Sequence, residues 1–168
     1  SRTIQGVDLV LQETEARIRV GRVTTVAQFS QDCAGEAMHR FLVERAKNLP
    51  QAVAIALIDG RGQLVNTSRG WPADPMDLSG RDFQTPKAGS VTGLVVGQPA
   101  RSRTTGKWAI YLARPVLGED GTFLGVVLGV VNALHLEEFY RAIALQPGTS
   151  VVVLRRDGTV LARHPSAD

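Results

Sequence analysis

The hydrophobic pattern changes its period sharply at Pro50, and that change sets the fold class. From Gly6 to Leu49, apolar residues recur at spacings of three and four, which is typical of amphipathic helix. After Pro50 the period becomes two, which predicts strands, and the proline itself ends the helix. The sequence therefore predicts an α+β fold in which a helical segment precedes an antiparallel sheet.

The helical segment is long for a globular domain. Two features can interrupt it, the β-branched cluster Val23–Val26 and Gly35. A helix of this length is expected either in a coiled-coil dimer or in a stalk that connects a domain to a membrane. We therefore expect residues 1–50 to form a helical stalk and dimerisation segment.

Turn sequences divide the second part of the chain into short strands. The turn Asp59–Gly62 predicts a hairpin between strands Ala52–Ile58 and Gln63–Ser68. Residues Gly70–Gly93 have no clean period, and a short amphipathic helix is expected at 134–143. Three further strands are expected, at Leu94–Arg101, Trp108–Val116 and Phe123–Asn132.

An internal repeat links the first hairpin to the C-terminal part of the chain. Ile55–Val65 and Val151–Leu161 share four apolar residues, a polar turn ending in glycine, one polar residue and two apolar residues. Any two hairpins can look alike, which is one explanation; the other is that each copy opens its own structural unit. We expect a complete unit at residues 51–146 and, at 147–168, the opening hairpin of a second, truncated unit.

Composition and motifs argue against catalysis and nucleic-acid binding. The formal net charge is +3, but basic residues are scattered and aromatic residues make up only 5%. The single Cys33 excludes an internal disulfide, and the three histidines lack metal-ligand spacing. Neither a P-loop nor a nucleophile elbow is present. We expect no enzyme, no metal and no cofactor, and membrane attachment only through flanking helices outside this chain.

The connection without periodicity holds the best candidates for a ligand site. Arg81, Asp82 and Phe83 bring together a fork-shaped cation, a carboxylate and an aromatic ring, which suits a small anionic or zwitterionic ligand. Alternatively, Arg81 and Asp82 form an internal ion pair that pins the loop, and Trp108 belongs to the core. The further candidates on or near the strands are Trp108, Tyr111, Arg114, Trp71 and Arg101.

Four segments in this order resemble the double Cache, or PAS-like, sensor domains of bacterial histidine kinases, diguanylate cyclases and chemoreceptors. The segments are Asp77–Phe83, Thr105–Trp108, Asp120–Asn132 and Arg155–Pro165. The resemblance implies a long helix packed on a membrane-distal, PAS-like unit of five antiparallel strands, followed by a membrane-proximal unit. It also implies a small ligand held between the sheet and the connection after the second strand.

Within that resemblance, Arg81 and Phe83 stand where the connection reaches the ligand. Amino-acid-binding members look like R-x-W-Y at this point, whereas this chain has Arg81-Asp82-Phe83-Gln84. Those members also carry an acidic residue on the last strand, and Phe123–Asn132 has none. The expected ligand is therefore an organic acid, a carboxylate without an amine.

The resemblance implies a periplasmic sensor that forms part of an inner-membrane receptor. Ligand binding would shift the population of two arrangements, and the helices of a homodimer would carry that shift to a cytoplasmic output domain. Two other functions stay open: a PAS-like dimerisation or spacer module without a small ligand, and an enzyme of unfamiliar type.

Overall fold

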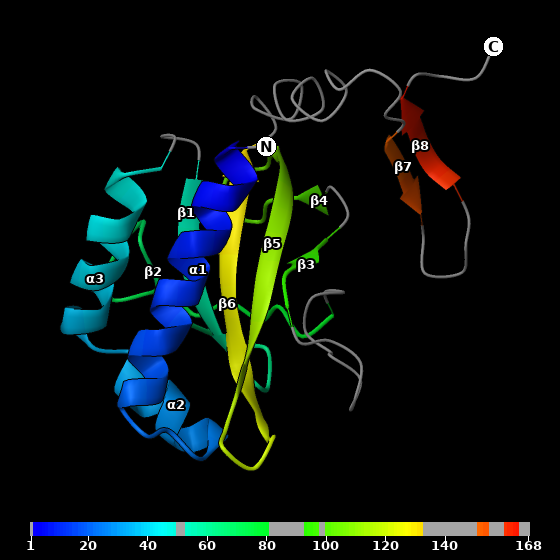
Figure 1. Cartoon of the computed structure of the whole chain (residues 1–168). Coiled ribbons are helices and arrows are strands. Elements are labelled where there is room, and N and C mark those ends of the chain that lie inside the picture. Colours follow the sequence, from blue (N-terminus) through cyan, green and yellow to red (C-terminus); the bar gives the residue numbers. More distant parts are fainter. Residues whose placement is uncertain are drawn as a thin grey trace.

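In the computed structural model, three helices cover one face of an antiparallel sheet (Figure 1). The structure describes residues 2–49, 53–80, 93–97, 100–132, 151–154 and 160–164. The predicted α+β class is confirmed. The short helix expected at 134–143 and the connection at 81–92 lie outside the described residues.

The expected N-terminal helical segment is present and consists of three helices, α1 (Arg2–Val20), α2 (Val26–Cys33) and α3 (Glu36–Lys47). It breaks at both of the features that could interrupt it. The Thr25 hydroxyl accepts a hydrogen bond from the backbone N–H of Gln28 at 3.1 Å and so caps the start of α2. The three helices pack on the sheet, and their part in dimerisation remains a prediction.

The break between α2 and α3 is held by one buried side chain of the sheet. The amide of Asn66 donates hydrogen bonds to the carbonyl oxygens of Cys33 and Gly35 at 2.9 and 3.0 Å. These carbonyls belong to the end of α2 and to the residue that precedes α3, where a helix leaves backbone groups without partners. Asn66 therefore fixes the turn between the two helices against the sheet.

The sheet has the strand order β2-β1-β6-β5-β3, and the short β4 also pairs with β5. All of these pairings are antiparallel. The expected strand Leu94–Arg101 is two short pieces on the same edge of β5, so the sheet has five strand positions. The strands are β1 (Val53–Asp59), β2 (Leu64–Thr67), β3 (Val95–Val96), β4 (Ala100–Arg101), β5 (Trp108–Leu117) and β6 (Phe123–Asn132).

Alternation along the strands divides the buried residues between the two faces of the sheet. The helix-covered face packs strand residues such as Ile55, Leu112 and Val127 against α1, α2 and α3. The opposite face carries a separate apolar cluster: Ala56, Ile58, Leu78, Ala109, Tyr111, Ala113, Val126 and Leu128. Every residue of β1 is buried, because both of its faces are covered.

Two glycines of β6 let the helices approach the sheet closely. A Cβ atom on Gly129 would lie 2.7 Å from Cγ1 of Val7 in α1. A Cβ atom on Gly125 would lie 2.8 Å from the ring of Phe29 in α2. Both glycines belong to the helix-covered face, where larger side chains would hold the helices away.

The C-terminal hairpin pairs β7 (Val151–Leu154) with β8 (Val160–His164), and the predicted hairpin is confirmed. Its register repeats that of β1 and β2. The register shifts after Leu57 in the first hairpin and after Val153 in the second, and these residues are equivalent in the sequence repeat. The likeness thus includes an irregularity that two unrelated hairpins need not share.

Candidate ligand-binding site

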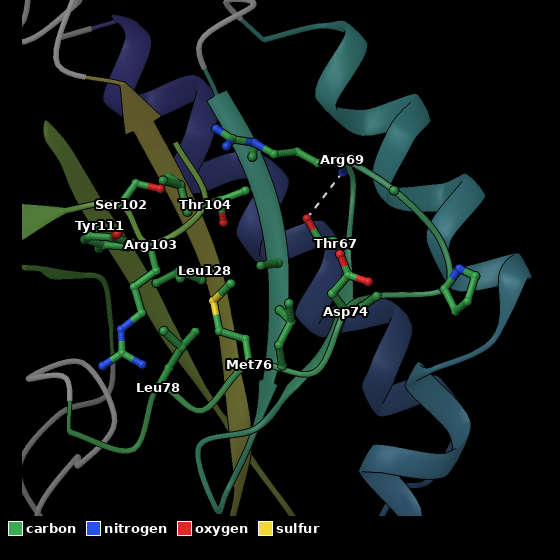
Figure 2. A pocket seen from close by; sticks show the side chains of 17 residues that line it. Thr67, Arg69, Asp74, Met76, Leu78, Ser102, Arg103, Thr104, Tyr111 and Leu128 are labelled. Atoms are coloured by element: carbon green, nitrogen blue, oxygen red, sulfur yellow. Dashed lines mark hydrogen bonds between the residues drawn. The ribbon is translucent and has the colours of Figure 1, made fainter. Parts of the chain in front are cut away.

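A pocket of about 250 Å³ opens on the sheet face that the helices leave uncovered (Figure 2). Its floor is formed by small and apolar side chains of β1 and β6: Ala54, Ala56, Leu128 and Val130. Tyr111 of β5, which is only 8% exposed, closes one side of this floor. A mostly apolar cavity of this size suits a small organic molecule.

One wall of the pocket is the connection that follows β2. Leu64 donates a backbone hydrogen bond to Met76 at 2.9 Å, and Leu78 donates one to Gly62 at 2.7 Å. These bonds hold the segment alongside the hairpin, so that Met76 and Leu78 line the pocket. Earlier in the same connection, nearer to β2, the indole N–H of Trp71 donates a hydrogen bond to the carbonyl oxygen of Ala34 at 2.9 Å.

The other wall is the turn between β4 and β5. Two backbone hydrogen bonds of 2.8 Å close this turn, from Ser102 to Lys107 and from Gly106 to Ser102. The turn places Ser102, Arg103 and Thr104 at the pocket. The Arg103 guanidinium reaches the opposite wall, where Nη1 donates to the carbonyl oxygen of Asp77 at 2.6 Å.

Charged groups of both signs stand around the apolar floor. Arg69 and Asp74 come from the connection and Arg103 from the turn, and all three side chains are exposed at the rim. Figure 2 shows Arg69 extending away from Asp74. Arginine can bind a carboxylate with two parallel hydrogen bonds, so the rim is equipped to hold an anionic group over an apolar floor. Among the described residues, no cluster of histidine, cysteine and acidic side chains could hold a metal ion.

The predicted site residues are distributed unevenly over the molecule. Tyr111 lines the pocket. Arg81, Asp82 and Phe83 lie outside the described residues. The described candidates that do not line the pocket are Trp71, Arg101, Trp108 and Arg114.

Arg101 and Trp108 form a pair at the end of the sheet. They stand opposite each other in the pairing of β4 with β5. The Arg101 guanidinium carbon lies 5.5 Å from the centre of the Trp108 ring, a cation–π distance. Trp108 is 50% exposed, so it is neither plain core nor pocket wall.

Arg114 lies on the helix-covered face and binds Asp8 of α1. Its Nε donates to Oδ1 at 2.6 Å and its Nη2 to Oδ2 at 3.0 Å, and both side chains are about one-fifth exposed. The hydrogen bond from Arg114 lowers the pKa of Asp8, although burial acts in the opposite direction. Arg114 therefore ties α1 to β5 behind the pocket.

Sequence reasoning missed Arg69, Asp74 and Arg103 as candidates. Asp74 belongs to the connection without periodicity, Arg69 directly precedes that connection, and Arg103 directly precedes a recognised turn. In the sequence, each of them is simply a charged residue in a segment that also contains glycine, proline or threonine. That signal is too common on protein surfaces to select particular positions.

A helix-backed antiparallel sheet with a ligand-sized pocket on its free face defines a class of small-molecule sensor domain. The family model described as "Cache domain" (dCache_1) matches residues 3–168, so the chain belongs to the Cache domain family. Cache domains are sensor modules rather than catalytic domains. The predicted family, the five-stranded Cache fold and the non-catalytic character are therefore confirmed.

Solved structures of extracellular sensor domains are similar to the chain over nearly its whole length. The extracellular domain of rpHK1S-Z16, described as a histidine kinase, has a TM-score of 0.63 and 30% identity, covering 98% of this chain and 64% of that one. The ligand-binding domain of Campylobacter jejuni chemoreceptor Tlp3 in complex with L-valine has a TM-score of 0.57 and 15% identity, covering 96% and 66%.

The ligand-binding domain of Pseudomonas fluorescens chemoreceptor CtaA, in complex with L-serine, has a TM-score of 0.54 and 19% identity, covering 96% of this chain and 64% of that one. The chain thus spans about two thirds of the length of these structures. No curated protein matches the sequence. Within the described part of the chain, no helix has the length and apolarity needed to cross a bilayer.

Proposed function

We propose that the chain is the extracytoplasmic sensor domain of a bacterial transmembrane signalling protein, and that it binds a small carboxylate-bearing ligand in the sheet-face pocket. The observation that carries this proposal is the apolar floor of about 250 Å³ beneath the exposed arginines Arg69 and Arg103. Two relatives support the proposal: the Tlp3 domain was solved in complex with L-valine and the CtaA domain in complex with L-serine, and both ligands carry a carboxylate.

Arg81 and Phe83 are part of the proposed site. Leu78 lines the pocket, and the segment that contains both residues follows it directly in the sequence. Arg81 would bind the ligand carboxylate, and Phe83 would supply an apolar contact. Asp82 would accept a hydrogen bond from Arg81 or from the ligand.

Signal transmission would run through the sheet to α1. In β6, Leu128 and Val130 line the pocket, while Gly129 between them contacts Val7 of α1 on the other face. A ligand that displaces β6 therefore also moves the surface on which α1 rests. If the ligand binds two positions of β6 with different affinity, it shifts the population of α1 positions, and a homodimer built on this helix passes the shift to the membrane.

The alternative function, a spacer module without ligand, has less support. It would be favoured if Trp108 filled the pocket, but Trp108 lies half exposed at the start of β5 beside Arg101. The repeated register of β7 and β8 supports a second unit that begins at residues 147–168, membrane-proximal in a periplasmic receptor.

The test is a thermal-shift screen of the domain against organic acids, amino acids, amines and purines. A ligand at 100 times its Kd adds about 2.7 kcal/mol to the free energy of unfolding, which raises the Tm by roughly 5–11 °C for a domain of this size. The proposed function expects a carboxylate among the hits, and Arg81→Ala should abolish that shift while leaving the Tm of the free domain unchanged. A flat screen with well-folded protein would contradict it.

A further inference from the structure

The pocket has two chemically different ends. At one end, the Arg103 guanidinium is held at the carbonyl oxygen of Asp77, and only one of its five N–H groups is used in that bond. At the other end stands Asp74, three residues earlier in the connection. Three extended residues span at most about 10 Å, which bounds the distance between the Cα atoms of Asp74 and Asp77 along this wall.

The Asp74 carboxylate has no hydrogen-bond or ion-pair partner among the residues that the structure describes. Arg69 is close in sequence, but Figure 2 shows its side chain running away from Asp74. A carboxylate at the rim of a pocket can accept hydrogen bonds from a ligand, and it repels a second carboxylate placed next to it.

Between the two ends, the surface is apolar. Met76, Leu78 and Leu128 lie between Arg103 and Asp74 in Figure 2, and all three line the pocket. Methylene groups of a ligand can replace water over these side chains, which favours binding of a hydrocarbon segment there. A ligand with charges at its two ends and a hydrocarbon middle matches this order of surfaces.

We propose that the pocket selects a ligand with a carboxylate and an ammonium group at opposite ends of a short hydrocarbon chain, and that Asp74 binds the ammonium group. This inference rests on the proposed function and narrows it. The sequence predicted a ligand without an amine, because the last strand has no acidic residue to bind one. The proposed ligand has an amine, because Asp74 of the connection supplies the acidic group. An α-amino acid carries both charges on neighbouring carbon atoms, whereas Arg103 and Asp74 lie on opposite sides of Met76 and Leu78 in Figure 2, so the longer spacing is the better match.

Three probes with the same carbon skeleton test the inference by calorimetry on the whole chain: pentanoate, 2-aminopentanoate and 5-aminopentanoate. 5-Aminopentanoate is expected to bind at least ten-fold more tightly than the other two. Asp74→Asn should remove that advantage and leave the affinity for pentanoate unchanged. Glu119→Gln, in the exposed turn between β5 and β6, makes the same change in net charge and should alter nothing.

Equal binding of 5-aminopentanoate and pentanoate, or an Asp74→Asn variant that keeps the preference, would overturn the role of Asp74 and leave the carboxylate sensor intact. Tighter binding of 2-aminopentanoate would overturn the opposite-ends arrangement. If none of the three probes binds, the inference fails. The proposed function then fails separately only if the wider screen is also flat.

Discussion

Replacing Gly129 by alanine tests how closely α1 is seated on the sheet. The added Cβ would lie 2.7 Å from Cγ1 of Val7 and 3.7 Å from Cδ2 of Leu11, and both of these side chains are fully buried. The helix therefore has to move off the strand. Overpacking of this kind costs about 1–3 kcal/mol, and the reduced freedom of the unfolded chain returns about 0.4–1 kcal/mol.

The net loss expected for Gly129→Ala is about 1–2 kcal/mol, equivalent to a Tm lower by roughly 2–8 °C for a domain of this size. Differential scanning calorimetry measures it. Gly80→Ala is the matched control, because no atom of the described residues lies within 4 Å of its added Cβ, and its Tm should stay the same or rise slightly.

A double-mutant cycle identifies the contact responsible. Val7→Ala removes the methyl groups that the new Cβ would meet, so it should be less harmful in the Gly129→Ala background than in the wild-type protein, with a coupling energy of about 0.5–3 kcal/mol. A Gly129→Ala variant that melts like the wild-type protein, or a cycle without coupling, would refute the close approach of α1 to β6.

Two further predictions concern residues on the helix-covered face of the sheet. The pKa of Asp8 is lowered by its hydrogen bond from Arg114, so this carboxylate stabilises the fold above its unfolded pKa of about 3.9 and loses its contribution as the pH falls through the lower folded value. Asp8→Asn should therefore cost about 1–2 kcal/mol in urea unfolding at pH 7 and progressively less below pH ~4; an equal loss at pH 7 and pH 3 would contradict the ion pair. Burial raises the pKa of the Cys33 thiol to about 12, so a thiol reagent at pH 8 should label the unfolded chain and leave the folded chain unlabelled; rapid labelling of the folded chain would show that α2 opens readily.

Much of the fold was predictable because it depends on local patterns. The change of hydrophobic period placed the helices before the sheet, and alternation along β5 put Tyr111 on the opposite face from Arg114. The break between α2 and α3 was less certain, because it depends on a partner outside the helical segment. The amide of Asn66, in the sheet, stabilises the break at Gly35.

The site was less predictable because its groups meet across long sequence separations. Arg114 was a reasonable pocket candidate on the strand pattern alone, but its partner Asp8 lies 106 positions away, on the other face. Arg103 reaches Asp77 across 26 positions. No periodicity encodes such meetings, so only the folded arrangement reveals them. The C-terminal hairpin, by contrast, was predictable, because the sequence repeat marked its strands and turn.

The most direct measurement is the Kd of the strongest hit from the ligand screen for the wild-type protein and two alanine-to-leucine variants. Ala56→Leu extends from the pocket floor into the cavity, and Ala16→Leu makes the same change on the exposed side of α1. If the sheet-face pocket is the binding site, Ala56→Leu should fold cooperatively and weaken binding at least ten-fold, while Ala16→Leu should bind normally. Undiminished binding by a folded Ala56→Leu variant would show that the ligand is held elsewhere.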